Sequence, residues 1–223
     1  MFSFQSEVLD GIFLPAKDQN SKKLMLVMHG LGDSALGYTW LLKELQIPEL
    51  SYWLVNAPTR YYEGYSWYDI EGEQGMGIKA SRDLLVQALS ELNHGGWSAQ
   101  DIILFGFSQG CVMAYTLGLT YPEVFAGICG VSGYIYWGQD FHLSPVAADQ
   151  NWLITHGTED QVIPPQLAKS SQKLLDEFGV PLQIEYFDKG HTIDFEREFP
   201  RLKSWIEERL SCESNRCLSN LDK

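Results

Sequence analysis

The sequence predicts an α/β fold in which a mostly parallel central sheet carries helices on both faces. Short apolar segments with strand character alternate with longer segments of helical periodicity along the chain, which is typical of repeated βα units. The 223 residues are enough for one domain with a substantial core. Polar residues able to do chemistry directly follow several apolar segments, and such sheets bind ligands beyond the carboxyl ends of their strands.

The predicted strands are short apolar runs that end in turn-forming or polar residues. In chain order they cover residues 22–28, 52–55, 102–105, 125–131, 152–155 and 182–187. We expect residues 2–14 to add an antiparallel hairpin at the leading edge of the sheet.

The predicted helices lie between these strands and after the last one. Ile78, Leu85 and Leu92 recur at helical spacing, for example, and predict an amphipathic helix. In chain order the helices cover residues 35–45, 77–93, 111–119, 165–177 and 194–210. Beyond this point the chain turns polar and loses its periodicity. The sequence therefore predicts a single domain over residues 1–210 and a flexible polar tail over residues 211–223.

The charge balance argues against a nucleic-acid partner. The formal net charge is −13 and the isoelectric point is about 4.7, and this sign repels nucleic-acid phosphates and anionic membranes alike. Solubility is the simplest explanation for the charge. An apolar content of 45%, with 13% aromatic residues, is typical of a globular protein.

We expect a cytoplasmic protein without a stable membrane anchor. No apolar run approaches the roughly 20 residues that span a bilayer. The first seven residues lack the basic and apolar regions of a signal peptide, and lipidation motifs are absent. Cys111 and Cys129 lie in apolar segments, and Cys212 and Cys217 lie in the polar tail. That distribution is no disulfide framework and fits a reducing compartment.

The pentapeptide at residues 106–110, Gly-Phe-Ser-Gln-Gly, follows a predicted strand and precedes a predicted helix. A serine at a sharp turn between strand and helix is typical of the nucleophile elbow of serine hydrolases. Both glycines have a steric role there, because side chains two residues either side of Ser108 would collide. Ser132 also follows a strand, but no helix comes behind it, and we interpret it as a loop residue.

A serine hydroxyl needs a neighbouring base to act as a nucleophile at neutral pH. Of the five histidines, His191 follows the predicted strand at 182–187 and precedes the last helix. It therefore lies at the carboxyl edge of the sheet, on a loop able to reach Ser108. The alternative is a surface histidine that caps the last helix.

The base in turn needs a carboxylate to orient it. Asp160 lies in the segment 156–164, which directly follows the predicted strand at 152–155, and it gives the chain order Ser, Asp, His. Glu159 next to it and Asp188 near the base are alternatives. A role for Asp160 in the turn alone is also open.

Stabilising the oxyanion of a tetrahedral intermediate requires preorganised N–H donors. The loop His29-Gly30-Leu31-Gly32-Asp33 follows the first parallel strand, and its glycines let the Leu31 N–H turn into the site. The second predicted donor is the Gln109 N–H, at the start of the helix after the serine, where the helix dipole also favours negative charge. We interpret His29 as a brace for this loop.

Two patterns that suggest a cofactor or metal are weak. Residues 75–80 match a glycine pattern of dinucleotide-binding loops, but the acidic segment 71–74 precedes them in place of a buried strand. His156 and Asp160 lack an obvious third metal ligand, and the tail cysteines have no companion pair. We therefore expect neither a cofactor nor a metal.

Five segments together resemble the acyl-protein thioesterase, lysophospholipase and carboxylesterase family of small α/β-hydrolases. They are residues 29–34 (HGLGDS), 56–60 (NAPTR), 66–70 (SWYDI), 106–110 (GFSQG) and 156–164 (HGTEDQVIP). The resemblance extends from about residue 22 to residue 210.

This resemblance implies an α/β-hydrolase fold without a large cap domain and without a cofactor. It assigns Ser108, Asp160 and His191 as a catalytic triad, and Leu31 and Gln109 as the oxyanion donors. It also implies hydrolysis of acyl esters or thioesters.

By the same resemblance, Trp67 helps to line the acyl-binding cleft, with ordinary core packing as the alternative. Two features depart from the family pattern. Cys111 stands where the family usually has another glycine after the elbow, and we expect it to tighten helix packing behind the serine. The segment 61–65 near the acyl cleft is shorter than in many members, so acyl-chain length cannot be carried over.

The sequence thus predicts a serine hydrolase that cleaves carboxylic esters or thioesters through an acyl-enzyme. A general short-chain carboxylesterase is the simplest form of this prediction. An acyl-protein thioesterase or a lysophospholipase, each requiring a longer acyl groove, is the alternative within the class. A non-catalytic scaffold is the alternative outside it. The expected partner is a small acyl ester or thioester, or an acylated protein, and a homodimer is left open.

Overall fold

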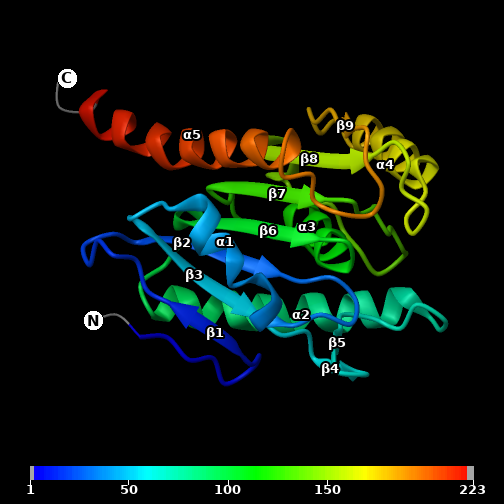
Figure 1. The fold of residues 1–223 in the computed structure, drawn as a ribbon, viewed down its shortest axis with the longest axis horizontal. Coiled ribbons are helices and arrows are strands. Elements are labelled where there is room, and N and C mark those ends of the chain that lie inside the picture. Colours follow the sequence, from blue (N-terminus) through cyan, green and yellow to red (C-terminus); the bar gives the residue numbers. More distant parts are fainter. Residues whose placement is uncertain (1–2, 220–223) are drawn as a thin grey trace.

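The computed structural model describes the backbone of residues 3–219 and the side chains of residues 3–211. The described residues form a seven-stranded sheet of order β1-β3-β2-β6-β7-β8-β9, and every neighbouring pair is parallel except β1 with β3 (Figure 1). The predicted, mostly parallel sheet is therefore confirmed. Its strands are β1 (Gly11–Leu14), β2 (Lys23–Met28), β3 (Leu50–Val55), β6 (Ile102–Phe107), β7 (Gly127–Val131), β8 (Trp152–Gly157) and β9 (Glu185–Phe187).

Helices cover both faces of this sheet, as predicted (Figure 1). No helix within the described residues is long and apolar enough to cross a bilayer. The α-helices are α1 (Trp40–Leu45), α2 (Gln74–His94), α3 (Gln109–Thr120), α4 (Pro165–Glu177) and α5 (Glu198–Ser219).

Strand β2 shows how each face is filled, because successive side chains of a strand point to opposite faces. Leu24, Leu26 and Met28 belong to a cluster with apolar residues of α2 and α3. Met25 and Val27 belong to a cluster with apolar residues of α1 and α5. Helix α4 packs with α3 in a third cluster. The apolar clusters on both faces hold the central parallel strands in place, so that their carboxyl ends lie at the same edge of the sheet.

A small hairpin of β4 (Thr59–Tyr61) and β5 (Gly64–Ser66) lies where the sequence indicates only a short loop. It packs on the loop after β2: the Gly32 N–H donates to the Tyr65 carbonyl at 2.8 Å. A Cβ atom at Gly64 would lie 2.1 Å from the Gly32 carbonyl oxygen, so this close approach requires glycine. The hairpin therefore supports the loop that carries a predicted oxyanion donor.

The predicted hairpin over residues 2–14 is wrong. Its first residue lies outside the described part, and only β1 is a strand, paired antiparallel with β3. Before β1, the Ser6 hydroxyl accepts the N–H groups of Val8 and Leu9 at 3.1 Å each and also bonds Glu91 on α2. Such side-chain bonds hold the backbone in a turn where a second strand would need it extended.

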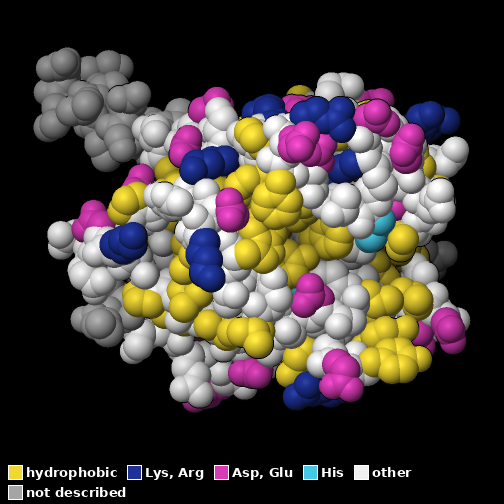
Figure 2. Space-filling view, in the orientation of Figure 1, with side chains coloured by type: hydrophobic (Ala, Val, Ile, Leu, Met, Phe, Trp, Pro, Cys, Tyr) yellow, Lys and Arg dark blue, Asp and Glu magenta, His cyan; other side chains and the backbone are white. Residues whose placement is uncertain are grey.

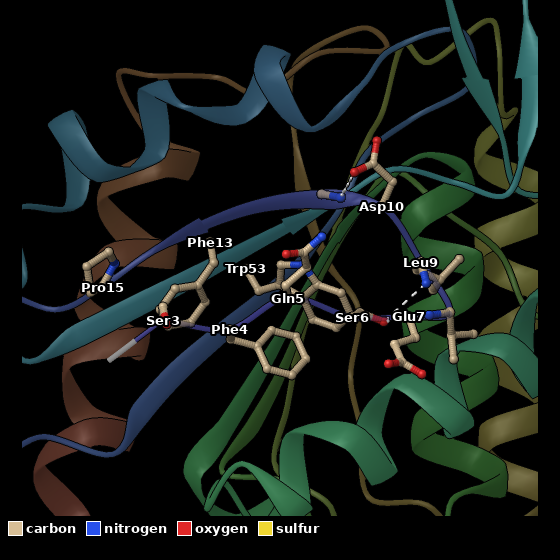
Figure 3. A pocket seen from close by; sticks show the side chains of 12 residues that line it. Ser3, Phe4, Gln5, Ser6, Glu7, Leu9, Asp10, Phe13, Pro15 and Trp53 are labelled. Atoms are coloured by element: carbon tan, nitrogen blue, oxygen red, sulfur yellow. Dashed lines mark hydrogen bonds between the residues drawn. The ribbon is translucent and has the colours of Figure 1, made fainter. Parts of the chain in front are cut away.

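The N-terminal segment instead packs by its aromatic side chains (Figure 3). The ring centroids of Phe4 and Trp53 lie 4.9 Å apart, and those of Phe13 and Trp97 lie 5.7 Å apart, both in edge-to-face arrangements. The segment and β1 border a pocket of about 550 Å³. This pocket lies beside β1, the edge strand of the sheet, and none of the predicted site residues lines it.

Helices α2 and α3 extend the predicted ranges by one to three residues at each end, and two other predictions differ more. The expected helix at 35–45 is divided into a 3-10 turn over Ala35–Tyr38 and the short α1. Helix α5 begins at Glu198, because Asp194 takes the N–H groups of the next turn on its own carboxylate. It continues to Ser219, because residues 211–219 contain neither Gly nor Pro, which would end a helix.

Strand β9 is shorter than the predicted strand at 182–187. The side chain of Gln172 on α4 donates to the Leu182 carbonyl at 2.7 Å and accepts the Ile184 N–H at 3.0 Å. These backbone groups are therefore bonded to a helix side chain and not to β8.

Candidate active site

The sharp turn predicted at Ser108 is present between β6 and α3. Ser108 has φ of 55° and ψ of −118°, an unusual conformation for a residue with a side chain. A Cβ atom at Gly106 would lie 2.2 Å from the Gly110 carbonyl oxygen, and one at Gly110 would lie 2.0 Å from the Met28 carbonyl oxygen. The predicted steric requirement for both glycines is confirmed, and the turn holds the Ser108 hydroxyl at the sheet edge.

A chain of hydrogen bonds links Ser108, His191 and Asp160. The distance from Ser108 Oγ to His191 Nε2 is 2.9 Å, and that from His191 Nδ1 to Asp160 Oδ2 is 2.8 Å. A neutral imidazole that donates from Nδ1 and accepts at Nε2 satisfies both bonds. The three residues come from loops after β6, β9 and β8, so the sheet brings together positions up to 83 residues apart.

Three carboxylates were considered as the partner of His191, and Asp160 is the one that lies within hydrogen-bonding distance of it. The Asp188 carboxylate instead accepts from the Thr158 hydroxyl at 3.4 Å. Glu159 is exposed, and its backbone N–H donates to the Lys189 carbonyl at 3.1 Å. That bond joins the loop after β8 to the loop after β9.

Asp160 is buried and held in its ionised form. One carboxylate oxygen accepts the N–H groups of Val162 at 3.0 Å and Ile163 at 2.9 Å, and the other accepts from His191. Burial by itself raises the pKa of this carboxyl, but the bonds from His191 and the backbone outweigh it and hold the pKa below the ordinary 3.8.

We expect this lowered pKa to make stability depend on pH in acid. Because the folded pKa lies below the unfolded value, Asp160 contributes stability above about pH 4 that is lost as the pH falls through the folded pKa. Urea unfolding at pH 5 and pH 3 should show a free energy of unfolding that falls more steeply for the wild type than for Asp160→Asn. Equal falls in both proteins would contradict this assignment.

His156 lies beside the same carboxylate but makes a different bond. It is fully buried, its Nε2 donates to the Ile163 carbonyl at 2.9 Å, and that nitrogen is 3.7 Å from Asp160 Oδ2. Burial lowers the pKa of His156, which keeps it neutral. Among the described residues, no three His, Cys, Asp or Glu side chains are grouped to hold a metal ion.

The loop after β2 lies directly against the serine. The register pairs Met28 with Gly106, and a Cβ atom at Gly30 would lie 3.3 Å from Ser108 Cβ. Gly30, the residue before Leu31, therefore packs against Ser108. Gln109 is the first residue of α3, so its N–H has no acceptor within the helix. Both predicted oxyanion donors therefore belong to backbone next to Ser108.

His29 braces this loop, as predicted. Its Nδ1 bonds the Gly30 carbonyl at 2.6 Å, and its Nε2 accepts the Ala57 N–H at 3.0 Å. The second bond requires an unprotonated Nε2, so Nδ1 carries the proton. Burial lowers the pKa of His29 and favours this neutral form.

Trp67 is packed in the core and also borders a pocket. It is almost fully buried, and its indole N–H donates to the His29 carbonyl at 2.9 Å. It also lines a pocket of about 630 Å³ together with Leu31, Tyr61 and Leu84. A further contact was not predicted: the backbone N–H of Trp67 donates to the side-chain carbonyl of Gln109 at 2.9 Å. Trp67 is thus fixed between the two loops that flank the serine.

Cys111 is buried behind the elbow, where a glycine is usual. A Cβ atom at Gly133 would lie 2.6 Å from its sulfur, and one at Gly130 would lie 2.5 Å from it. The thiol thus packs tightly against glycines of β7 and of the turn after it. Burial raises the pKa of Cys111 and makes it unreactive. Cys111 and Cys129 are free thiols, and the side chains of the two tail cysteines lie outside the described residues.

A buried ion pair lies beneath the histidine loop. Lys189 Nζ is 2.7 Å from Glu198 Oε1, and their side chains are 3% and 0% exposed. The ammonium also donates to the Thr192 carbonyl at 2.6 Å and to the Ser132 hydroxyl at 3.4 Å. Burial lowers the pKa of Lys189, although Glu198 acts in the other direction. No sequence signal indicated this pair, since a lysine between Asp188 and a glycine resembles an exposed loop residue.

The sheet order, the strained serine between β6 and α3 and the loops after β2, β8 and β9 define a protein of the α/β-hydrolase fold. The chain belongs to the phospholipase/carboxylesterase family, whose model matches residues 10–210. Family membership indicates a hydrolase of the esterase and thioesterase kind, in agreement with the resemblance in the sequence.

Individual proteins are similar over most of the chain. Acyl-protein thioesterase 1 of Schizosaccharomyces pombe is 32% identical over 166 residues, which cover 68% of this chain and 74% of that protein. Carboxylesterase SOBER1 of Arabidopsis thaliana is 25% identical over 222 residues, which cover 89% and 95%.

Solved structures agree with the fold. The crystal structure of esterase PE8 has a TM-score of 0.72 at 27% identity and covers 90% of this chain and 98% of that chain. The carboxylesterase of Bacillus cereus has a TM-score of 0.78 at 18% identity, covering 91% and 95%, and shows similarity of fold alone.

Proposed function

We propose that this protein is a serine hydrolase that cleaves carboxylic esters or thioesters through an acyl-enzyme on Ser108. The observation that carries the proposal is the unbroken chain of hydrogen bonds from Ser108 through His191 to Asp160, at 2.9 and 2.8 Å. A nucleophile within reach of a base that a carboxylate orients is the arrangement that acyl transfer requires.

In the acylation step, Ser108 Oγ attacks the carbonyl carbon and its proton passes to His191 Nε2. The carbonyl oxygen becomes an oxyanion, which the N–H groups of Leu31 and Gln109 stabilise. Asp160 stabilises the imidazolium by its bond to Nδ1. When the tetrahedral intermediate collapses, His191 returns the proton to the departing alcohol or thiol, and the acyl group remains on the serine.

In the deacylation step, water takes the place of the leaving group. His191 accepts a proton from the water as it attacks the acyl carbon, and the same oxyanion donors act again. Collapse of this intermediate releases the carboxylic acid and returns the proton to Ser108. The cycle needs no cofactor, and each proton transfer uses the same nitrogen.

We propose short acyl esters as the general substrate class and the pocket beside Trp67 as the acyl site. That pocket, of about 630 Å³, is lined by Leu31, a predicted oxyanion donor, and mostly by apolar side chains. The named relatives include both thioesterases and carboxylesterases, which supports extending the class to thioesters and acylated proteins.

Partitioning between water and methanol tests the acyl-enzyme. We would hydrolyse the p-nitrophenyl ester and a neutral alkyl thioester of the same acid in buffer containing methanol, and measure the ratio of methyl ester to free acid. A shared acyl-enzyme predicts the same ratio from both substrates, since both leaving groups depart before the partition. Ratios that differ between the substrates would overturn the mechanism.

The same assay identifies the acyl preference. Acyl chains from acetyl to palmitoyl, offered in both series, should give one common order of kcat/KM if both use the pocket beside Trp67. The enzyme without its serine, Ser108→Ala, provides the background rate for every substrate.

A further inference from the structure

A separate pocket borders the histidine. It has a volume of about 400 Å³ and is lined by His191 and by apolar side chains from the 3-10 turn over Ala35–Tyr38, from α1, from the elbow and from the loop before α5. The described linings of this pocket and of the pocket beside Trp67 have no residue in common. The lining residues used below are Tyr38, Trp40, Phe107, His191, Ile193 and Phe195.

The wall of this pocket is aromatic and partly open to solvent. Phe195 is 53% exposed, and its ring centroid lies 5.1 Å from that of Trp40 in an edge-to-face arrangement. Phe107, next to the serine, packs against the His191 ring with centroids 5.0 Å apart. Figure 2 shows hydrophobic side chains gathered over the region between α1 and the start of α5. Trp40 is half-buried against the core and supports the exposed ring of Phe195, and such an exposed ring beside a reactive centre can bind a ligand.

The chemistry of the reaction decides which part of a substrate meets this wall. The atom that leaves must lie within hydrogen-bonding distance of His191 Nε2, because that nitrogen protonates it. The oxyanion must point instead toward Leu31 and Gln109. A pocket bordered by His191 and the residues after it therefore receives the leaving group, whereas the pocket bordered by Leu31 receives the acyl chain.

We propose that this aromatic pocket is a leaving-group subsite that selects esters and thioesters with an uncharged apolar or aromatic leaving group. The proposal rests on the function proposed above. Asp33 is the carboxylate in the described lining, and no Lys or Arg side chain belongs to it. An anionic leaving group would therefore lose its hydration and meet a like charge, whereas an aromatic ring gains contact with Trp40 and Phe195.

Benzyl butanoate and methyl butanoate test the subsite, because they share one acyl group and their alcohols have similar acidity. They also share one acyl-enzyme, so kcat/KM, which reports acylation, is the quantity to compare. We expect the wild type to favour the benzyl ester by about 10-fold or more, as for filling an apolar pocket. Phe195→Ala and Trp40→Ala should each bring the benzyl-to-methyl ratio toward one and leave methyl butanoate within about threefold.

Two controls separate the outcomes. Tyr186→Ala removes another exposed aromatic ring, on β9, and should leave the ratio unchanged. The octanoate-to-butanoate ratio of the methyl esters should also stay the same in Phe195→Ala, since the acyl chain lies elsewhere. A benzyl-to-methyl ratio that both pocket variants leave unchanged, or an acyl-chain ratio that falls in its place, would overturn the subsite. Hydrolysis that persists in Ser108→Ala would instead overturn the underlying mechanism.

Discussion

Replacement of Ser108 by alanine should lower kcat by about 10⁵- to 10⁶-fold while the protein remains folded. The hydroxyl makes its side-chain hydrogen bond to His191 alone among the described contacts, so its removal affects one bond of a ring that is partly exposed to solvent. The residual rate would come from the oxyanion donors and from binding. Steady-state hydrolysis of p-nitrophenyl butanoate, with circular dichroism and thermal unfolding of the same sample, measures both quantities.

The matched variants for this experiment are His191→Ala and the double variant with Ser108→Ala. Because the two residues act as one unit, the double variant should be about as slow as either single one. Losses that multiply would show that the two residues act independently. A single variant that keeps more than a tenth of the wild-type kcat would remove Ser108 or His191 from the chemistry.

Replacement of Lys189 by methionine should lower the free energy of unfolding by about 3 to 5 kcal/mol. Glu198 is 0% exposed, and the change leaves its carboxylate buried without the ammonium 2.7 Å away. The Thr192 carbonyl, next to the histidine, also loses its donor. Urea unfolding near neutral pH measures the loss, with the m value as the check that the unfolded state has not changed.

The double variant Lys189→Met with Glu198→Gln is the matched control. Glutamine removes the buried charge and keeps an oxygen for the Asp194 N–H, which Glu198 accepts at 3.0 Å. Most of the lost stability should therefore return. If the single variant is as stable as the wild type, or the double variant is less stable than the single one, the pair is not the source of the stability.

The elements best predicted from sequence are those whose own residues decide them. Helix α4 begins and ends where predicted, because Pro165 suits the first turn and the apolar periodicity stops before Gly179. Strand β9 is shorter than predicted because Gln172 on α4 bonds the backbone of Leu182 and Ile184, which precede the strand. The hairpin of β4 and β5 has strands of only three residues, too short for a periodic pattern.

For the site, too, features that depend on local sequence were predicted, and contacts between distant segments were not. The proximity of Ser108, Asp160 and His191 could be predicted because each lies in the segment after a predicted strand, and parallel strands bring such segments to one edge. The ion pair of Lys189 with Glu198 could not, since it depends on how α5 begins beneath the loop. The bond between the Gln109 side chain and Trp67 is likewise a tertiary contact between distant segments.

The central claim is that the fold activates Ser108, and a fluorophosphonate probe tests it most directly. Attack by an activated serine forms an oxygen–phosphorus bond with loss of fluoride, and peptide mass spectrometry locates the adduct. We predict one adduct per molecule, on Ser108, that is absent from Ser108→Ala and lost from His191→Ala. A folded wild-type protein that forms no adduct, or forms it on another residue, would contradict the account.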